Sequence, residues 1–185
     1  MIRTVCVALA LLILPMSLRA ADQAPPKVGD RVADFELPSL AGGTVKLSEV
    51  VKQGPTAVIV LRGFPGYQCP LCRKQVQAFT KEAAGFEEVG ARVLLIYPGD
   101  VNDLAAKAKE FLGAQELPEG FQLLIDPGYS FTNAWNLRWD APKETAYPST
   151  FVIDKDLKVK MAKVSDSHGG RTAPADVLKS LSGGQ

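Results

Sequence analysis

A Cys-x-x-Cys pair lies between an apolar run and a segment with helical spacing. Residues 57–61 (Ala-Val-Ile-Val-Leu) are apolar throughout, which indicates a buried strand. Cys69 and Cys72 follow this run after a turn that contains glycine and proline. The apolar residues between positions 71 and 79 then recur at helical intervals. The sequence therefore predicts a strand that turns into a helix at the two cysteines.

This position favours reactive thiols. A helix N-terminus carries partial positive charge and free N–H groups, and both stabilise a thiolate over a thiol. Such a setting lowers a cysteine pKa from about 8.5 toward roughly 3.5–7.5. Arg62 and Arg73 flank the pair and add positive charge in the same region. Cys69 and Cys72 are therefore the candidate catalytic residues.

The first 21 residues have the pattern of a secretory signal. Arg3 gives a short basic region, residues 5–14 are uncharged and almost wholly apolar, and Ala20 and Ala21 provide small residues for cleavage. The apolar run is too short for a membrane span. We expect residues 1–21 to be removed, residues 22–27 to form an extended leader, and residues 28–185 to form one domain. The mature protein would be exported to the periplasm or extracellular space, with no stable membrane association.

Loss of the signal would also remove Cys6, so the mature chain would keep two cysteines. A disulfide across three positions closes too small a loop to stabilise a fold much. Structural zinc needs about four ligands, whereas this chain offers one cysteine pair and one histidine, His168. In an exported chain, this cysteine usage favours redox chemistry over a structural or metal site. We expect no bound metal.

Composition and motifs narrow the remaining classes. The net charge of +1 gives no general attraction to nucleic acid or to an anionic membrane. The Ala41-Gly42-Gly43 stretch lacks the spacing of a nucleotide-binding glycine loop. We therefore expect neither a nucleic-acid partner nor a nicotinamide, flavin or other cofactor.

The pattern along the domain alternates strands and helices. Two short strands around residues 41–43 form a predicted hairpin, and a second hairpin surrounds Asp154-Lys155-Asp156. The other predicted strands are residues 57–62, 92–97 and 121–125, and the predicted helices are residues 69–84, 101–112, 129–137 and 174–181. This order predicts an α/β fold, a three-layer sandwich with a mixed sheet.

Three segments carry a family resemblance. From Val28-Gly29-Asp30 to Leu47-Ser48 the chain is similar to the N-terminal extension of peroxiredoxins. Residues 147–154 (Tyr-Pro-Ser-Thr-Phe-Val-Ile-Asp) are similar to the cis-proline segment of thioredoxin-like proteins. Pro65-x-x-x-Cys69-x-x-Cys72 matches the peroxiredoxin Pro-x-x-x-Thr-x-x-Cys pattern, except for the cysteine at the threonine position. The chain thus resembles the peroxiredoxin-like alkyl hydroperoxide reductase/thiol-specific antioxidant group, which implies a thioredoxin-like α/β/α sandwich with an N-terminal hairpin extension.

The resemblance leaves two orders of reaction open. In the peroxiredoxin pattern, Cys72 attacks a peroxide and Cys69 resolves the sulfenic acid as a disulfide. In the thioredoxin pattern, Cys69 attacks another protein's disulfide and Cys72 resolves the mixed disulfide. The match of Pro65 and Cys72 favours the first pattern.

The resemblance also implies residues that position the substrate. A cis peptide bond before Pro148 would expose backbone groups beside the cysteines. The family uses an arginine near the attacked oxygens, contributed from the region before the late strand. The expected positioning residues are Pro65, Pro148 and one of the arginines Arg62, Arg73 and Arg138.

The expected function is an exported, thiol-dependent antioxidant oxidoreductase that reduces peroxides through Cys69 and Cys72. Its electrons would come from a thiol donor such as a thioredoxin-like protein. One alternative is a thiol–disulfide oxidoreductase acting on protein disulfides. The other is a copper-binding or delivery module that uses Cys69, Cys72 and His168.

Overall fold

The computed structural model describes residues 24–100 and 102–183, so the predicted signal at residues 1–21 lies outside the described part. The described leader residues 24–27 form no helix or strand. The strands are β1 (Glu36–Pro38), β2 (Thr44–Lys46), β3 (Thr56–Val60), β4 (Arg92–Gly99), β5 (Phe121–Pro127), β6 (Ser149–Ile153) and β7 (Val159–Val164). The helices are α1 (Leu47–Val50), α2 (Pro70–Lys81), α3 (Ala83–Glu88), α4 (Leu104–Leu112), α5 (Ser130–Ala134) and α6 (Pro174–Ser182). Across these described ranges, no helix combines the length and apolar character that crossing a bilayer requires.

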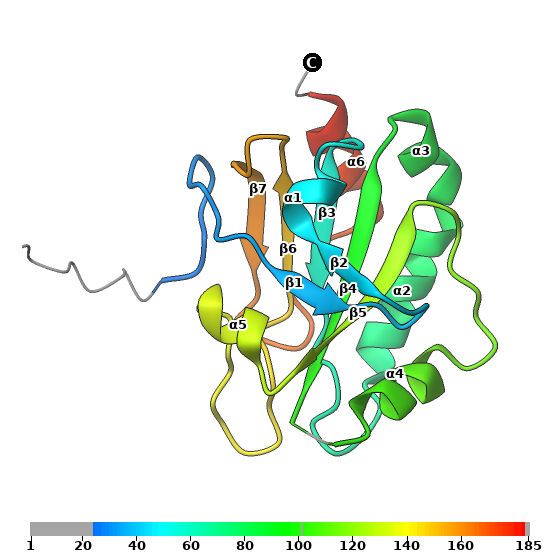
Figure 1. Cartoon of the computed structure of the whole chain (residues 1–185), viewed down its shortest axis with the longest axis vertical. Coiled ribbons are helices and arrows are strands. Elements are labelled where there is room, and N and C mark those ends of the chain that lie inside the picture. Colours follow the sequence, from blue (N-terminus) through cyan, green and yellow to red (C-terminus); the bar gives the residue numbers. More distant parts are fainter. Residues whose placement is uncertain (1–23, 101, 184–185) are drawn as a thin grey trace, which may run out of the picture.

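A five-stranded mixed sheet forms the centre of the molecule (Figure 1). Its strand order is β5-β4-β3-β6-β7, with β3, β4 and β5 parallel to one another. The strand β6 runs antiparallel to β3, and β7 runs antiparallel to β6. The predicted mixed sheet is therefore confirmed, with the predicted late hairpin as its β6–β7 edge.

Alternate residues of β3 face two separate cores. Ala57 and Ile59 lie in one core, whereas Val58 and Val60 lie in the other. This alternation is the two-residue period of a strand buried on both faces. The first core contains side chains of α2, α3, α4 and α6, and the second contains side chains of α1, α5 and the β1–β2 hairpin. The predicted α/β/α sandwich is confirmed.

The N-terminal hairpin extension is also present. The strands β1 and β2 pair antiparallel, with Leu37 opposite Val45. The hairpin is joined to β5 because the Leu40 N–H donates to the Leu123 carbonyl at 2.9 Å. The extension therefore covers the face of the sheet opposite α2 (Figure 1).

Several predicted element ends differ from the observed ones. The predicted helix over residues 69–84 is two helices, since α2 ends at Lys81 and α3 begins at Ala83. The strand β4 continues through Pro98 to Gly99, because these residues still pair with Asp126 and Pro127 of β5. The proline does not end the strand, since its carbonyl is free to accept a hydrogen bond.

Gly63 fixes the path of the loop that leads to the cysteines. Its φ is +68°, and a Cβ at this position would overlap the Pro98 carbonyl oxygen. The same carbonyl accepts a hydrogen bond from the Phe64 N–H at 2.9 Å. The loop is thereby fastened to the carboxyl end of β4.

We expect Gly63→Ala to destabilise the protein more than Gly66→Ala, a matched control in the same loop. Gly66 also has a positive φ of +106°, but its Cβ would meet nothing within 4 Å. Gly66→Ala should cost the backbone strain alone, about 1–2 kcal/mol. Gly63→Ala should cost about 1–3 kcal/mol more, because the backbone must move. Denaturant unfolding of the two variants would measure the difference, and equal losses would contradict the proposed close contact.

Candidate active site

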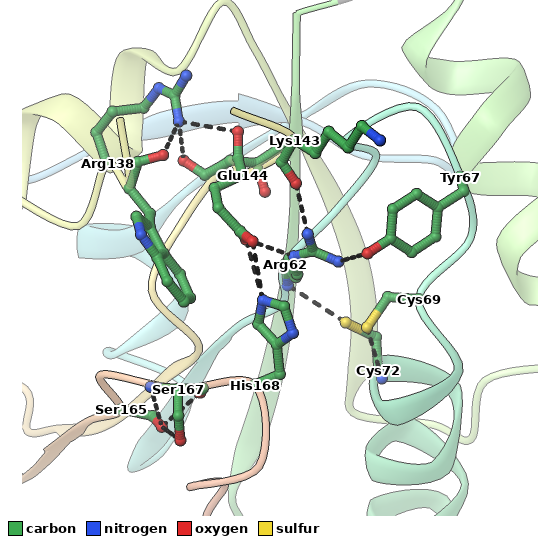
Figure 2. Close-up of polar contacts among 12 residues, drawn as sticks. Arg62, Tyr67, Cys69, Cys72, Arg138, Lys143, Glu144, Ser165, Ser167 and His168 are labelled. Atoms are coloured by element: carbon green, nitrogen blue, oxygen red, sulfur yellow. Dashed lines mark hydrogen bonds and ion pairs between the residues drawn. The ribbon is translucent and has the colours of Figure 1, made fainter. Parts of the chain in front are cut away.

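Cys69 is the N-cap residue of α2. Its backbone is extended (φ −78°, ψ 114°), and Pro70 occupies the first helical position, where a missing N–H costs nothing. The Cys69 sulfur accepts a hydrogen bond from the Cys72 N–H at 3.4 Å (Figure 2). The Cys-Pro-x-Cys sequence thus forms the start of the helix and brings the Cys69 sulfur to a backbone N–H of the first helical turn.

Both sulfurs are nearly closed to solvent. Cys69 is 3% exposed and Cys72 is fully buried, and both are free thiols in this structure. Tyr67 and Leu71, on either side of Cys69, are exposed instead. Cys69 is therefore the sulfur nearer the surface, and Cys72 lies one helical turn behind it.

Two nitrogen donors converge on the Cys72 sulfur. The backbone N–H of Arg62, at the end of β3, donates to it at 3.3 Å (Figure 2). The guanidinium of Arg171 donates to it at 3.3 Å and lies 3.9 Å from the Cys69 sulfur. Arg171 is itself held by the Gln75 side chain and by the His168 carbonyl. One cationic group therefore spans both thiols.

The surroundings separate the acidities of the two thiols. A hydrogen bond from the Cys72 thiol lowers the pKa of Cys69 to about 5, although burial opposes the shift. The Cys72 N–H and the charges of Arg171 and Arg62 act in the same direction. Burial raises the pKa of Cys72, and its hydrogen bond to Cys69 and the Cys69 charge raise it further. These surroundings favour the thiolate on Cys69 over a thiolate on Cys72.

We expect alkylation of Cys69 by iodoacetamide to follow a titration near pH 5. A free thiol would react appreciably only near pH 8.5. Because the folded pKa is lower than the unfolded one, the thiolate stabilises the reduced fold fully above about pH 8.5. That contribution shrinks as the pH falls and is lost below about pH 5. Absorbance of the thiolate at 240 nm between pH 4 and 9 would measure the titration of Cys69. Urea unfolding over the same range would measure the stability of the reduced protein, and Cys69→Ser is the control for each.

The side chain of Arg62 forms a buried ion pair. Its Nε donates to the Glu144 carboxylate at 2.6 Å, and its other nitrogens bind the Tyr67 hydroxyl and the Lys143 carbonyl (Figure 2). Arg62 is only 2% exposed. The predicted positioning residue therefore donates to Cys72 through its backbone, and its charge also lowers the pKa of Cys69. Its side chain joins residues 143–144 to the end of β3.

The other two predicted arginines contact backbone carbonyls elsewhere. Arg73 donates to the Glu110 carbonyl, and Arg138 donates to three carbonyls of its own loop, from Trp139, Glu144 and Thr145. The Arg138 guanidinium also lies 4.0 Å from the Tyr129 ring centroid. The structure brings neither guanidinium to a sulfur. The arginine at the thiols is Arg171, which sequence reasoning missed.

The sequence left the state of the peptide bond before Pro148 open, and the bond is trans, as is every described peptide bond. Pro148 directly precedes β6, and its carbonyl accepts the Ser165 N–H at 2.9 Å. This bond continues the β6–β7 pairing beyond Ser149 and Val164. Pro148 thus starts an ordinary strand. Pro65 is half-buried in the loop between Gly63 and Cys69.

His168 contacts a carboxylate rather than the cysteines. Its Nε2 lies 3.0 and 3.2 Å from the two Glu144 oxygens (Figure 2). Within residues 24–100 and 102–183, no three His, Cys, Asp or Glu side chains gather closely enough to hold a metal ion. Cys69, Cys72 and His168 therefore do not form the metal site that a copper module would need.

Comparisons with known proteins agree with this geometry. Residues 28–162 match the model of the AhpC/TSA family. The chain is 42% identical over 135 residues to a putative peroxiredoxin of Mycobacterium tuberculosis, across 72% of this chain and 82% of that protein. It is 32% identical over 128 residues to a chloroplastic peroxiredoxin Q of rice, across 69% of this chain and 54% of that protein. The chain thus spans about half the length of the rice relative.

Two further proteins are similar to the chain. The thiol-disulfide oxidoreductase ResA of Halalkalibacterium halodurans is 24% identical over 135 residues, across 73% of this chain and 67% of that protein. The crystal structure of the peroxidoxin BcpB from Mycobacterium tuberculosis superposes with a TM-score of 0.66 and 28% identity, across 86% of this chain and 99% of that chain. The chain is therefore similar to thiol redox proteins in both sequence and structure.

Proposed function

This chain belongs to the AhpC/TSA family and is an oxidoreductase, and on that premise we propose that it reduces peroxides through a Cys69–Cys72 dithiol–disulfide cycle. We further propose that Cys69 reacts first. The order favoured by the sequence, with Cys72 first, is less well supported, because Cys72 is fully buried, whereas Cys69 caps the start of α2 and is the sulfur nearer the surface.

The proposed first step oxidises Cys69. The thiolate attacks one peroxide oxygen, the O–O bond breaks, and the electron pair leaves on the other oxygen, which takes a proton from solvent to give an alcohol or water. Cys69 becomes a sulfenic acid. The Arg171 guanidinium, 3.9 Å from the Cys69 sulfur, is placed to stabilise negative charge on the departing oxygen.

The second step forms the disulfide. The Cys72 sulfur attacks the Cys69 sulfur, the S–O bond breaks, and hydroxide leaves with the Cys72 thiol proton as water. Two electrons from an external dithiol, such as a thioredoxin-like protein, then restore both thiols by exchange. The overall change reduces one peroxide and oxidises one donor dithiol.

The low solvent exposure of the two cysteines is the observation that favours a peroxide as the substrate. Cys69 is 3% exposed and Cys72 is 0% exposed, which suits a small substrate that enters between side chains. A disulfide in a folded protein brings two flanking chain segments with it. Burial also strengthens the interaction of Arg171 with developing charge, since the surroundings are poorly screened.

Reduction of protein disulfides is the second candidate. Tyr67 and Leu71 are exposed on both sides of Cys69, where a docked polypeptide could cover them. The similarity to the oxidoreductase ResA points the same way. In that reaction Cys69 would attack a substrate sulfur, and Cys72 would release the resulting mixed disulfide.

Stopped-flow oxidation of the reduced protein would distinguish the two candidates. We expect hydrogen peroxide or cumene hydroperoxide to oxidise both thiols much faster than they oxidise free cysteine. Oxidised insulin-type disulfides should exchange slowly by comparison. Peroxide rates equal to those of free cysteine, together with fast exchange with protein disulfides, would overturn the peroxidase proposal and leave the second candidate.

We also propose that the protein is exported, to the periplasm or the extracellular space. This rests on the signal-like pattern of residues 1–21 and on the cysteine usage of the remaining chain. Mass spectrometry of the protein purified from a secreting host would test it. A mature chain beginning at Ala21 or Asp22 is expected, and an intact Met1 on a cytoplasmic protein would contradict export.

A further inference from the structure

His168 lies where two hydrogen-bonded routes to the Cys72 sulfur meet. On one route, the His168 carbonyl accepts the Arg171 Nε–H at 3.0 Å, and Arg171 donates to Cys72. On the other, the His168 ring binds Glu144, and Glu144 binds the side chain of Arg62. The Arg62 N–H then donates to Cys72. These contacts form a closed ring of five residues.

The ring links Arg171, whose charge acts on the thiols, to Glu144, which binds the side chain of Arg62. Arg171 comes from the loop after β7, and Glu144 comes from the loop before β6. The contact between the His168 ring and Glu144 joins the two loops. The Trp139 ring, 5.3 Å from the His168 ring, packs beside this contact and stacks on Tyr147 in turn.

We propose that His168 is a positioning residue for the redox reaction, which holds Arg171 on one side and the Arg62–Glu144 pair on the other against the cysteines. His168 touches neither sulfur, and it acts through Arg171 and Glu144. This inference rests on the proposed role of the Cys69 thiolate but not on the choice between peroxide and disulfide as substrate.

The direction of its effect follows from the contacts. Without the His168 ring, the loop that carries Arg171 loses its link to Glu144, so the guanidinium spends less time at the sulfurs. The Cys69 thiolate then loses part of its compensating positive charge. The thiol should become less acidic, and it should react more slowly below neutral pH.

The test is the pH dependence of Cys69 alkylation in four variants of the full chain. His168→Ala should raise the midpoint by about one unit, which lowers the thiolate fraction, and with it alkylation at pH 5, about fivefold. His168→Gln keeps a neutral side-chain donor toward Glu144, and it should restore most of the wild-type midpoint. Asp166→Ala changes an exposed residue of the same loop and should leave it unchanged. Arg171→Gln is the positive control and should raise it most.

Each outcome has a separate meaning. An unchanged midpoint in His168→Ala, beside a raised one in Arg171→Gln, would overturn the positioning role. A midpoint raised equally in His168→Ala and His168→Gln would also overturn it, because a side-chain donor toward Glu144 would then not be what sets the midpoint. A lower melting temperature with an unchanged midpoint would show a structural role alone.

A wild-type midpoint near that of free cysteine would instead contradict the proposed Cys69 thiolate. If His168→Ala fails to fold, His168→Leu takes its place, because leucine fills the space of the ring but donates nothing to Glu144. A midpoint for His168→Leu above that of His168→Gln would support the proposal, and one equal to wild type would reject it.

Discussion

Cys69→Ser is expected to abolish turnover and to leave Cys72 almost unreactive. Serine cannot form a thiolate, and the remaining Cys72 thiol is fully buried with a raised pKa. We expect the rate of peroxide-dependent thiol loss to fall by at least about 10³-fold, as when a catalytic nucleophile is removed. Stopped-flow measurement of the first turnover at pH 7, without an electron donor, would give this rate directly.

Cys72→Ser is the matched control for this prediction. It keeps the N-cap thiolate but lacks the resolving thiol, so one equivalent of peroxide should be consumed and the reaction should stop at a sulfenic acid on Cys69. Mass spectrometry after dimedone trapping would locate the modification. Rapid oxidation of Cys69→Ser, with sulfenic acid on Cys72, would reverse the proposed order and restore the peroxiredoxin pattern read from the sequence.

Arg62→Met should be the most destabilising substitution at the site. It leaves the Glu144 carboxylate, which is 12% exposed, without its main partner. Breaking a buried ion pair from one side costs about 3–5 kcal/mol. Burial opposes the Glu144 charge, and the hydrogen bonds from Arg62 and His168 outweigh it and lower the pKa of Glu144. Without Arg62 that pKa should rise, so the loss of stability should be smaller at low pH, where the carboxyl is neutral.

A double-mutant cycle separates the ion pair from the loss of packing. Glu144→Gln in the Arg62→Met background removes the unpaired carboxylate, so the double variant should recover part of the stability lost in Arg62→Met. Urea unfolding at pH 5 and pH 8 would measure all four proteins. Additive losses at both pH values would show that Arg62 and Glu144 do not act as a pair.

Much of the fold follows from local sequence patterns. Each central strand is a short apolar run between turn residues, and the Ala57–Leu61 run is buried on both faces as such runs require. The hairpin extension followed from its glycine turn. The element ends were harder to predict, because strand pairing extends β4 past Pro98 and the backbone leaves helical geometry at Glu82 (φ −95°, ψ 16°).

The candidate site was only partly readable from the sequence. Cys69 and Cys72 followed from their own spacing, and the N-cap position of Cys69 followed from the strand-to-helix turn. Arg171 lies about 100 positions from the cysteines, and only the return of the chain after β7 brings it to them. The available signal was a lone arginine after Gly169-Gly170, near the single histidine, and nothing local links that loop to the thiols. The trans bond before Pro148 could not be predicted, because a motif resemblance does not fix a peptide bond.

The unequal acidity of the two thiols also sets the direction in which electrons flow. A thiolate at Cys69 stabilises the dithiol state and not the disulfide, so it makes the disulfide more oxidising. With a pKa of about 5, Cys69 favours the ionised form at pH 7, which stabilises the reduced state relative to a pair of ordinary thiols and makes the reduction potential of the pair more positive. Dithiol donors should therefore reduce the oxidised protein more completely. The position of Cys69 at the helix N-cap thus favours the reduced state, which is the state that reacts with peroxide.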